Sequence, residues 1–498
     1  MLKLVLGTSG SGKTTLLYAR IRARAEAGKR SILLVPEQFT SSTEARIYRE
    51  LGDALSGMVE SYSFTSLAEH ILAVEGGAAV QTLTDAGRAV LVRRALEELQ
   101  DNVHYYYRHR RSAAFCQMAA ETIDELKSAG LSGQQLQELA RDCGTESAKL
   151  GELALIFQGY ESLLAGTGMD PADRLELAAD RLEAALARDE LPDFLQEREV
   201  FIDEFDTFNA PKKRLMGAML AALPAVTVAL CEDGAPMQPG DLELFSGAKQ
   251  VAAQLRQLAR KNGAQVAAPE LLRRDLRHKD APGLAALTEL LETGSCTPPE
   301  SAPELRLFAA ASREEEARCA AAAIRRLMRQ GVRCGKIAVV CRDISLYRAA
   351  VRYEFRMAEI PLYCDEPTTP EFSAPATAVR ALLALLRGAD MTEQLTVLAK
   401  TGLCALTEPE VCALENYAYT WSPNAAAWRA EFTKSPRGFG DAELTEEDTQ
   451  NLTRAEHARK KLVTAVDTLR SKVRSANAEQ ISRALYFCLK ELGAEGQQ

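Results

Sequence analysis

Residues 7–14 constrain the fold of this chain more than any other stretch. They read Gly-Thr-Ser-Gly-Ser-Gly-Lys-Thr and match the phosphate-binding loop pattern G-x-x-x-x-G-K-[ST]. The apolar run Leu2–Leu6 before them predicts a buried strand, and Thr14–Ala27, which lacks Gly and Pro, predicts a helix that stops at Gly28. A strand, a glycine-rich loop and a helix in this order are typical of a P-loop fold built on a parallel sheet.

Each residue type in this loop has a physical reason. Backbone N–H groups must converge on phosphate oxygens, where a Cβ would intrude, and the helix N-terminus adds partial positive charge. The Lys13 ammonium would reach the β- and γ-phosphates of a nucleotide, and the Thr14 hydroxyl would ligate Mg²⁺. A glycine-rich turn without a ligand is the alternative. The predicted nucleotide-binding residues are Gly7, Thr8, Ser9, Gly10, Ser11, Gly12, Lys13 and Thr14.

An acidic pair follows a second apolar run, Val200–Ile202. A strand that ends in Asp-Glu is the Walker B pattern, in which Asp203 would hold the Mg²⁺ and Glu204 would activate water for attack on the γ-phosphate. Lys13 and Asp203 are 190 positions apart (203 minus 13), yet both must meet at the carboxyl edge of one sheet. The almost wholly helical pattern of residues 83–190 predicts a helical insertion between neighbouring strands.

Two strand-to-helix turns pair an aromatic ring with hydroxyl groups. Strands are predicted at Ser31–Pro36 and Met58–Tyr62, and each is followed by the tripeptide Phe-Thr-Ser. Such turns can stack on a base and bind phosphate oxygens. Alternatively, Ser41 starts and caps a helix, and both rings belong to the core. The candidate DNA contacts are Phe39, Thr40, Ser41, Phe64, Thr65 and Ser66.

The net charge restricts how this chain could bind a polyanion. The chain has 60 Lys and Arg against 69 Asp and Glu, a net charge of −9, so a polyanion would have to bind at local basic patches. Aromatic and basic residues gather at 105–111. They could bind nucleic acid, or they could form a helix end whose charges are solvated. Eleven cysteines without a C-x-x-C pair predict reduced thiols. No apolar run approaches the ~18 residues that a membrane span needs. We therefore expect a cytoplasmic protein without a membrane partner.

The length of 498 residues predicts several domains. A second α/β pattern begins after a Pro-rich stretch, with strands predicted at Leu305–Ala309 and Lys336–Cys341 and helices at Arg313–Gln330 and Ser345–Met357. We expect a first lobe at 1–82 and 191–292, a helical insertion at 83–190, a linker at 293–304, the start of a second α/β lobe at 305–400, and a helical insertion of that lobe at 401–498.

Together these features resemble the N-terminal part of the B subunit of the bacterial ATP-dependent helicase/deoxyribonuclease, the AddB/RexB family, an offshoot of the superfamily 1 helicases. The resemblance implies an α/β, superfamily 1 helicase-like fold: a P-loop parallel sheet with a helical insertion, then a second α/β lobe with helical additions. It rests on Gly7–Thr14, Val35–Thr40, Ser63–Leu67, Phe201–Asp206, Thr401–Leu403, Leu414–Tyr417 and Trp421.

The resemblance also implies a function. In this family the AddB chain binds ATP, Mg²⁺ and DNA, both single strands and duplex ends, and forms a heterodimer with the helicase/nuclease A subunit, which is the motor. The heterodimer processes DNA double-strand breaks for homologous recombination. The family's B subunit is longer and ends in a nuclease domain whose cysteines hold an iron–sulfur cluster. We therefore expect this chain to be a fragment without the nuclease half and without that cluster.

Two departures from the superfamily 1 pattern bear on activity. The Gly-Asp…Gln segment expected after the strand Val226–Leu230 is replaced by Val228–Asp233, and no Asn-Tyr-Arg-Ser motif precedes the linker, so Arg342 is the nearest candidate for an interface arginine. Without a γ-phosphate sensor, we expect at most weak ATP hydrolysis. The alternatives are an active superfamily 1 helicase, a catalytically silent scaffold with a relic P-loop, and a P-loop phosphotransferase acting on a small molecule.

Overall fold

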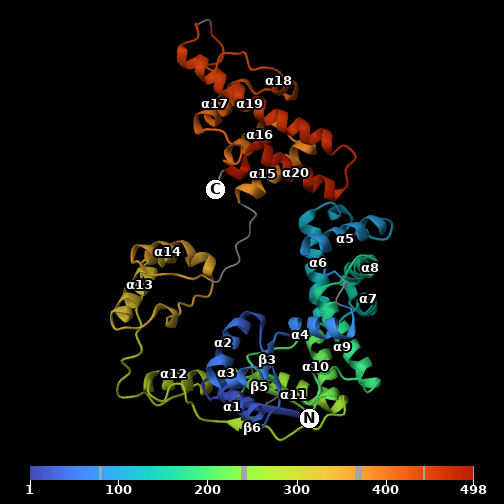
Figure 1. Cartoon of the computed structure of the whole chain (residues 1–498), viewed down its shortest axis with the longest axis vertical. Coiled ribbons are helices and arrows are strands. Elements are labelled where there is room, and N and C mark those ends of the chain that lie inside the picture. Colours follow the sequence, from blue (N-terminus) through green and yellow to red (C-terminus); the bar gives the residue numbers. More distant parts are fainter. Residues whose placement is uncertain (78–80, 237–243, 365–372, 441–442, 497–498) are drawn as a thin grey trace. The chain divides into compact units, whose positions relative to one another are not determined.

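The computed structural model describes residues 1–77, 81–236, 244–364, 373–440 and 443–496 (Figure 1). The chain forms two compact units, Met1–Leu307 and Phe308–Gln498. Residues 234–240, rich in Gly and Pro, predict a loop, and 237–240 of them lie outside the described residues. Among the helices that are described, none combines the length and the apolar character that crossing a bilayer requires.

The first unit is built on a six-stranded sheet in which every pairing is parallel, which confirms the predicted α/β fold. The spatial order is β3-β2-β4-β5-β1-β6. Because all strands run the same way, the segments that follow β1, β2, β4, β5 and β6 emerge at one edge. The strands are β1 (Leu2–Gly7), β2 (Ser31–Leu34), β3 (Val59–Tyr62), β4 (Glu199–Ile202), β5 (Ala225–Cys231) and β6 (Glu270–Leu272).

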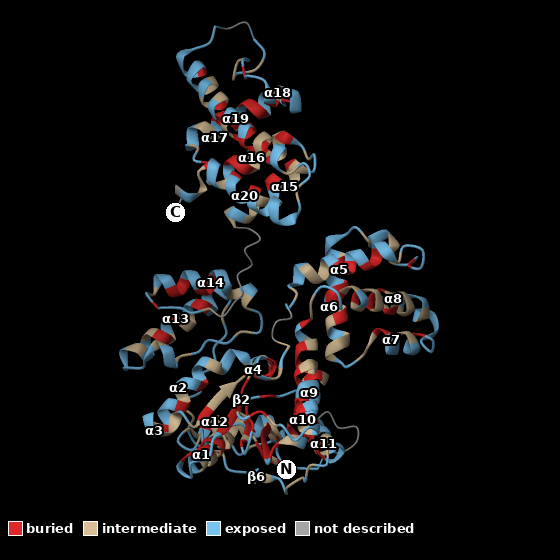
Figure 2. Ribbon diagram, turned by 45° about the vertical axis from the view of Figure 1, so that its right-hand side comes forward, coloured by how far each residue is buried: buried red, intermediate tan, exposed pale blue. Residues whose placement is uncertain are grey.

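Helices cover both faces of this sheet, which explains why its strands are continuous apolar runs. Leu4 and Leu6 of β1 pack on one face, whereas Val5 packs on the other. The helices that contribute core residues to the Leu4 face are α4 (Phe64–Glu75), α9 (Pro171–Ala187), α10 (Ala210–Ala222) and α11 (Ser246–Lys261). Those that contribute to the Val5 face are α1 (Lys13–Glu26) and α2 (Thr40–Leu51). Figure 2 shows the buried residues concentrated between these layers.

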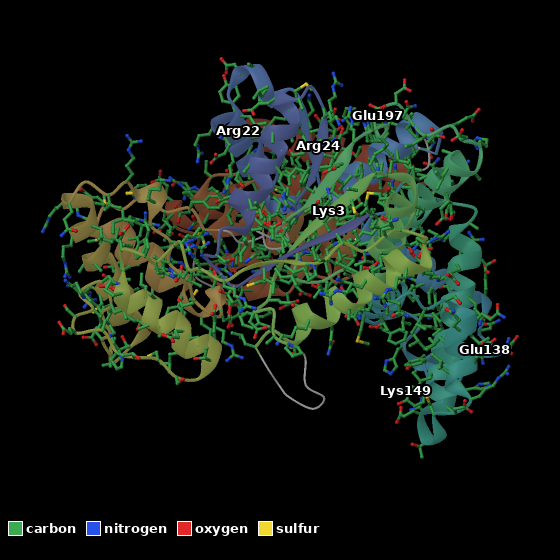
Figure 3. The ribbon with its side chains drawn as sticks, turned by 90° about the horizontal axis from the view of Figure 1, so that it is seen from below. Lys3, Arg22, Arg24, Glu138, Lys149 and Glu197 are labelled. Atoms are coloured by element: carbon green, nitrogen blue, oxygen red, sulfur yellow. The ribbon has the colours of Figure 1, made fainter. Side chains whose placement is uncertain are left out.

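Ion pairs connect β1, β4 and α1 at the edge of the sheet where these strands begin. Glu199, at the start of β4, lies 3.4 Å from the Lys3 Nζ of β1 and 3.3 Å from an Arg24 guanidinium nitrogen of α1. Lys3 and Arg24 are labelled in Figure 3. Arg24 also donates to the carbonyl oxygen of Glu197. These contacts connect β1, β4 and the last turn of α1 at the end of the sheet opposite the P-loop.

The helical insertion has its own core. Its helices are α5 (Asp85–Glu98), α6 (Ala113–Ser128), α7 (Gly133–Ala140) and α8 (Ser147–Leu164). Lys127 of α6 pairs with Asp170, 2.8 Å away, and with Asp173 of α9, 2.9 Å away, which attaches α6 to the helix that packs on the sheet. Residues 105–111 belong to the connection between α5 and α6 and include a short 3₁₀ turn (Tyr107–His109). The Glu152 carboxylate accepts backbone hydrogen bonds from Tyr105 and Tyr106 just before this turn. Nucleic-acid binding by this segment stays a prediction.

The second unit contains two groups of helices. α13 (Arg313–Arg329) and α14 (Ile344–Met357) pack together, and their predicted bounds are right to within one residue. A larger core surrounds the fully buried Trp428. Its helices are α15 (Ala374–Leu386), α16 (Met391–Lys400), α17 (Glu408–Trp421), α18 (Ala425–Arg429), α19 (Glu446–Lys472) and α20 (Ala478–Leu492).

The strands predicted at Leu305–Ala309 and Lys336–Cys341 are wrong. Within the described ranges neither segment pairs with another strand, and Leu307 is 100% exposed. An apolar run becomes a strand only where a neighbour completes the hydrogen-bond ladder. Conversely, β6, the short helix α3 (Asp53–Ser56) and α12 (Pro282–Thr293) were not predicted.

Candidate nucleotide-binding site

The loop between β1 and α1 has the backbone of a phosphate cradle. Gly10 and Gly12 have φ angles of 80° and 92°, a conformation that residues with a Cβ rarely adopt. A Cβ at Gly10 would also lie 2.8 Å from the Asp275 carboxylate. α1 begins at Lys13, directly after the loop, so its free N–H groups face the same mouth.

Lys13 folds back over this loop. Its Nζ donates to the carbonyl oxygens of Gly7, 2.7 Å away, and Thr8, 2.8 Å away. Burial lowers the pKa of Lys13, and the Cys231 and Asp203 side chains partly offset that effect. The ammonium group is therefore held at the loop by weak carbonyl partners, which an anionic ligand could replace.

Ser11 is a buried residue of the loop. It is 4% exposed, and its Oγ has no hydrogen-bond partner in the part of the chain that the structure describes. This oxygen lies against Gly7, where an added Cβ would clash with it, and Ser11 does not line the P-loop cavity. The glycine cradle and Lys13 are therefore the features that fit a bound phosphate chain.

The acidic pair lies beside the loop, at the end of β4. Asp203 is buried, its backbone N–H donates to the Leu34 carbonyl at 3.1 Å, and its carboxylate accepts from the Glu204 N–H at 3.0 Å. Glu204 has a φ of 65°, which is unusual for a residue with a side chain and is typical of functional turns. Burial and the neighbouring Asp203 raise the pKa of Glu204, while Arg46 lowers it.

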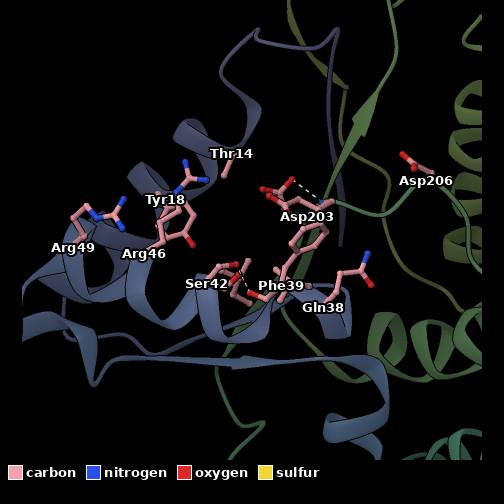
Figure 4. A pocket seen from close by; sticks show the side chains of 13 residues that line it. Thr14, Tyr18, Gln38, Phe39, Ser42, Arg46, Arg49, Asp203 and Asp206 are labelled. Atoms are coloured by element: carbon pink, nitrogen blue, oxygen red, sulfur yellow. Dashed lines mark hydrogen bonds between the residues drawn. The ribbon is translucent and has the colours of Figure 1, made fainter. Parts of the chain in front are cut away.

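Two adjoining cavities connect these residues. A cavity of about 370 Å³ contains the P-loop, and another of about 620 Å³ runs from Asp203 to α2 (Figure 4). Thr14, Arg46 and Glu204 line both. The first is lined by Ser9, Gly10, Gly12, Lys13, Thr14, Thr15, Arg46, Glu204, Cys231, Leu276 and Arg277. The second is lined by Thr14, Tyr18, Leu33, Val35, Gln38, Phe39, Ser42, Thr43, Arg46, Arg49, Asp203, Glu204 and Asp206.

The donor set suits Mg²⁺ rather than a metal held by protein groups alone. Among the described residues, no three His, Cys, Asp or Glu side chains gather as a metal site. Thr14 and Asp203 do line one cavity, and Mg²⁺ is commonly held by one carboxylate and a hydroxyl together with phosphate oxygens. These two residues therefore fit the ion that the sequence predicts.

Two arginines that the sequence analysis missed lie at this site. Arg46, on α2, has its guanidinium carbon 4.8 Å from the centre of the Tyr18 ring. Arg277 follows β6 and donates to the Ser9 Oγ at 3.2 Å. Arg277 was missed because β6 was not predicted. A sixth parallel strand would have placed the residues that follow it at the same edge of the sheet as the P-loop. Arg46 could have been found only from the packing of α2.

At the end of β5 the chain has Cys231, Glu232 and Asp233 in place of a Gly-Asp…Gln segment. Cys231 is the residue that lines the P-loop cavity there. Glu232 is buried, and its electrostatic neighbours include Arg256 and Lys249 of α11. The alternative candidate, Arg342, belongs to the second unit, before α14, and stays a prediction.

The first aromatic turn opens onto the larger cavity. Phe39 is 37% exposed and lines that cavity with Gln38 and Ser42. The prediction that Ser41 starts and caps the helix is wrong, because α2 begins at Thr40 and has no side-chain cap. The hydroxyls of Thr40 and Ser42 donate instead to the carbonyls of Glu37 and Phe39, at 3.0 and 2.9 Å. Ser41 is exposed.

The second aromatic turn does not present its ring. Phe64 is 2% exposed and packs edge-on against Phe205 and Phe208, with ring centres 5.2 and 6.0 Å away. Ser66 forms a capping box with Ser63. Of the three candidates, Thr65 and Ser66 are exposed, but Phe64 is a core residue and is not available to stack on a base. For this ring the structure supports the core alternative.

Comparison with known proteins agrees with these observations. Residues 4–288 match the family model described as ADDB, N-terminal. Proteins named as the B subunit of the ATP-dependent helicase/deoxyribonuclease are similar to nearly the whole chain. The one from Desulforudis audaxviator is 30% identical over 99% of this chain and 44% of its own length. The one from Moorella thermoacetica is 31% identical over 86% of this chain and 38% of its own length. The chain thus spans less than half of these relatives, and it belongs to the AddB N-terminal family, as its motifs predicted.

Proposed function

We propose that the first unit binds ATP with Mg²⁺ at Gly7–Thr14. One observation carries this proposal: Glu204 lines one cavity with Lys13 and Thr14, and Asp203 lines the adjoining cavity with Thr14, although the chain separates the two pairs widely. The glycine cradle gives independent support. Small nucleotide kinases need no comparable insertion between these motifs.

Each residue then has a role. The loop N–H groups and Lys13 would bind phosphate oxygens. Thr14 and Asp203 would hold Mg²⁺, which neutralises phosphate charge when bound. Glu204 would accept a hydrogen bond from the attacking water and orient it. Glu204, whose φ is 65°, lines both cavities.

The substitution Glu204→Gln tests this division of roles. We expect the variant to bind ATP as tightly as the wild type in calorimetry, because the amide keeps the shape of the side chain. Its turnover should fall by at least about tenfold, since general base catalysis typically contributes 10²–10⁴-fold. Unchanged turnover would remove Glu204 from the reaction, and loss of binding would show that its role is structural.

We infer further that the chain is part of the B subunit of a cytoplasmic heterodimeric helicase/nuclease that acts on DNA breaks, with DNA and the A subunit as partners. The names of the relatives support this function. A first lobe at 1–82 and 191–292, an insertion at 83–190, a linker at 293–304 and a second lobe from 305 remain our proposed division. Single-stranded DNA would contact the turn at Phe39–Ser41, where an exposed ring adjoins Arg46 and Arg49.

An active helicase is the main competing function. Cys231 at the end of β5 offers no amide to sense a γ-phosphate, which favours slow turnover that is weakly coupled to DNA. We expect the purified chain to hydrolyse ATP slowly and to leave a tailed duplex intact. Robust unwinding would favour the active helicase, whereas absence of ATP binding would favour the silent scaffold.

A further inference from the structure

The segment that follows β6 lies against the P-loop. The backbone N–H of Leu276 donates to the Gly10 carbonyl at 3.0 Å, and the Arg277 guanidinium donates to the Ser9 Oγ at 3.2 Å. Leu276 also lies close enough to Gly12 that an added Cβ there would meet its Cδ1 at 3.0 Å. A single crossing segment therefore lies against three residues of the loop.

This crossing is held in place by its own hydrogen bonds. The Asp275 carboxylate accepts from the N–H groups of Arg277 and His278, at 3.0 and 3.1 Å, and pairs with the His278 ring at 2.8 Å. Burial by itself would raise the pKa of Asp275, but the hydrogen bonds from His278 and Arg277 outweigh it and lower the pKa. Arg277 is thus presented to the cavity by a fixed turn.

The same segment returns to the loop with the opposite charge. α12 begins at Pro282, and Glu292, near its end, lines a cavity of about 540 Å³ together with Ser9 of the loop and Cys231. Burial raises the pKa of Glu292, while the Thr8 hydroxyl and the charge of Lys13 lower it in part. One segment, residues 273–293, therefore places a cation and an anion on the same phosphate-binding loop.

We propose that Arg277 and Glu292 set the nucleotide affinity of this P-loop in opposite directions. Arg277 exchanges Ser9 for a phosphate oxygen, whereas the Glu292 carboxylate, at the cavity that Ser9 also lines, repels the phosphates. The proposal rests on the proposed ATP site and adds two residues that determine its affinity. Its physical basis is that a charge-assisted contact favours a bound anion, while a nearby like charge opposes it.

Four variants test this proposal by equilibrium titration with Mg²⁺-ATP. Arg277→Ala should weaken binding by about tenfold or more, as expected for one lost charge-assisted contact. Glu292→Gln should tighten it by about three- to tenfold, as expected for one removed repulsion across a partly screened distance. The matched controls are Arg274→Ala on the same loop and Glu289→Gln one turn earlier on α12. Neither control residue lines the described cavities, and both variants should bind like the wild type.

The ATP affinity should fall in Arg277→Ala and rise in Glu292→Gln, and these opposite changes distinguish a local electrostatic role from damage to the fold. Thermal unfolding of each variant establishes that it is folded. Equal affinity for the wild type, Arg277→Ala and Glu292→Gln would overturn the proposal, while a loss of binding in Lys13→Ala would still support the ATP site. If the wild type itself does not bind ATP, the proposed function and this proposal both fail.

Discussion

Two turns of this protein have the same sequence and different surroundings. Phe39-Thr40-Ser41 and Phe64-Thr65-Ser66 both follow a parallel strand and both open a helix. Phe39 lies at a cavity that reaches Asp203, whereas Phe64 is buried among Phe205 and Phe208. The two helix starts also differ. Ser63 caps α4 directly before Phe64, whereas Phe39 is the last residue of a 3₁₀ turn that follows Pro36, and α2 has no side-chain cap.

The comparison teaches that a tripeptide does not determine exposure by itself. The side chains around each ring do so, because Phe205 and Phe208 cover Phe64 whereas Phe39 lines a cavity. Substitutions in the two turns test this difference.

Replacement of Phe64 should have the largest effect. Phe64→Ala removes a fully buried ring and leaves a cavity beside two other rings, which typically costs about 3–5 kcal/mol of the free energy of unfolding. Thermal or denaturant unfolding of the purified chain measures this loss. A near-wild-type stability would mean that Phe64 is not a core residue and that the two turns are alike.

Replacement of Phe39 should act on DNA rather than on stability. Phe39→Ala should weaken binding of a single-stranded oligonucleotide by about 1–3 kcal/mol, the usual value of one base–aromatic stack. Tyr48→Ala is the matched control, because Tyr48 is an exposed ring on α2, the helix that follows Phe39, and does not line the cavity. If both variants bind the oligonucleotide equally well in fluorescence anisotropy, Phe39 is not a DNA contact.

Replacement of Ser63 and of Ser41 should have the smallest effects on the free energy of unfolding. Ser63→Ala loses a cap that accepts from the Ser66 N–H at 3.1 Å, at a cost of about 1 kcal/mol. Ser41→Ala should change the free energy of unfolding by less than about 0.5 kcal/mol, because Ser41 is exposed and caps nothing. Paired denaturant titrations of the two variants decide this, and equal losses would contradict the assigned helix starts.

Much of the fold followed from strong local patterns. Continuous apolar runs located β1, β2, β4 and β5, and the P-loop located the start of α1. The sheet position of Asp203 beside Lys13 also followed, because parallel strands share one carboxyl edge. These predictions depended on interactions within one strand or one turn, which short stretches of sequence encode.

The failures depended on partners that the sequence does not name. β6 has only three residues, so it shows no period, and it is a strand because β1 accepts it as a neighbour. Lys336–Cys341 has the better strand pattern but no neighbour within the described residues. Arg277 and Glu292 reach the P-loop only because β6 and α12 bring them there. Such residues can be identified only once the tertiary contacts are known.

The central claim is that Gly7–Thr14 binds a nucleotide, and titration of Mg²⁺-ATP into the wild type and Lys13→Ala tests it most directly. The account predicts that the variant binds about ten- to a hundredfold more weakly, the value of one lost charge-assisted contact of about 1.5–3 kcal/mol. Lys29→Ala, at an exposed lysine just beyond the end of α1, should bind like the wild type. Equal affinity of the wild type and Lys13→Ala would contradict the account.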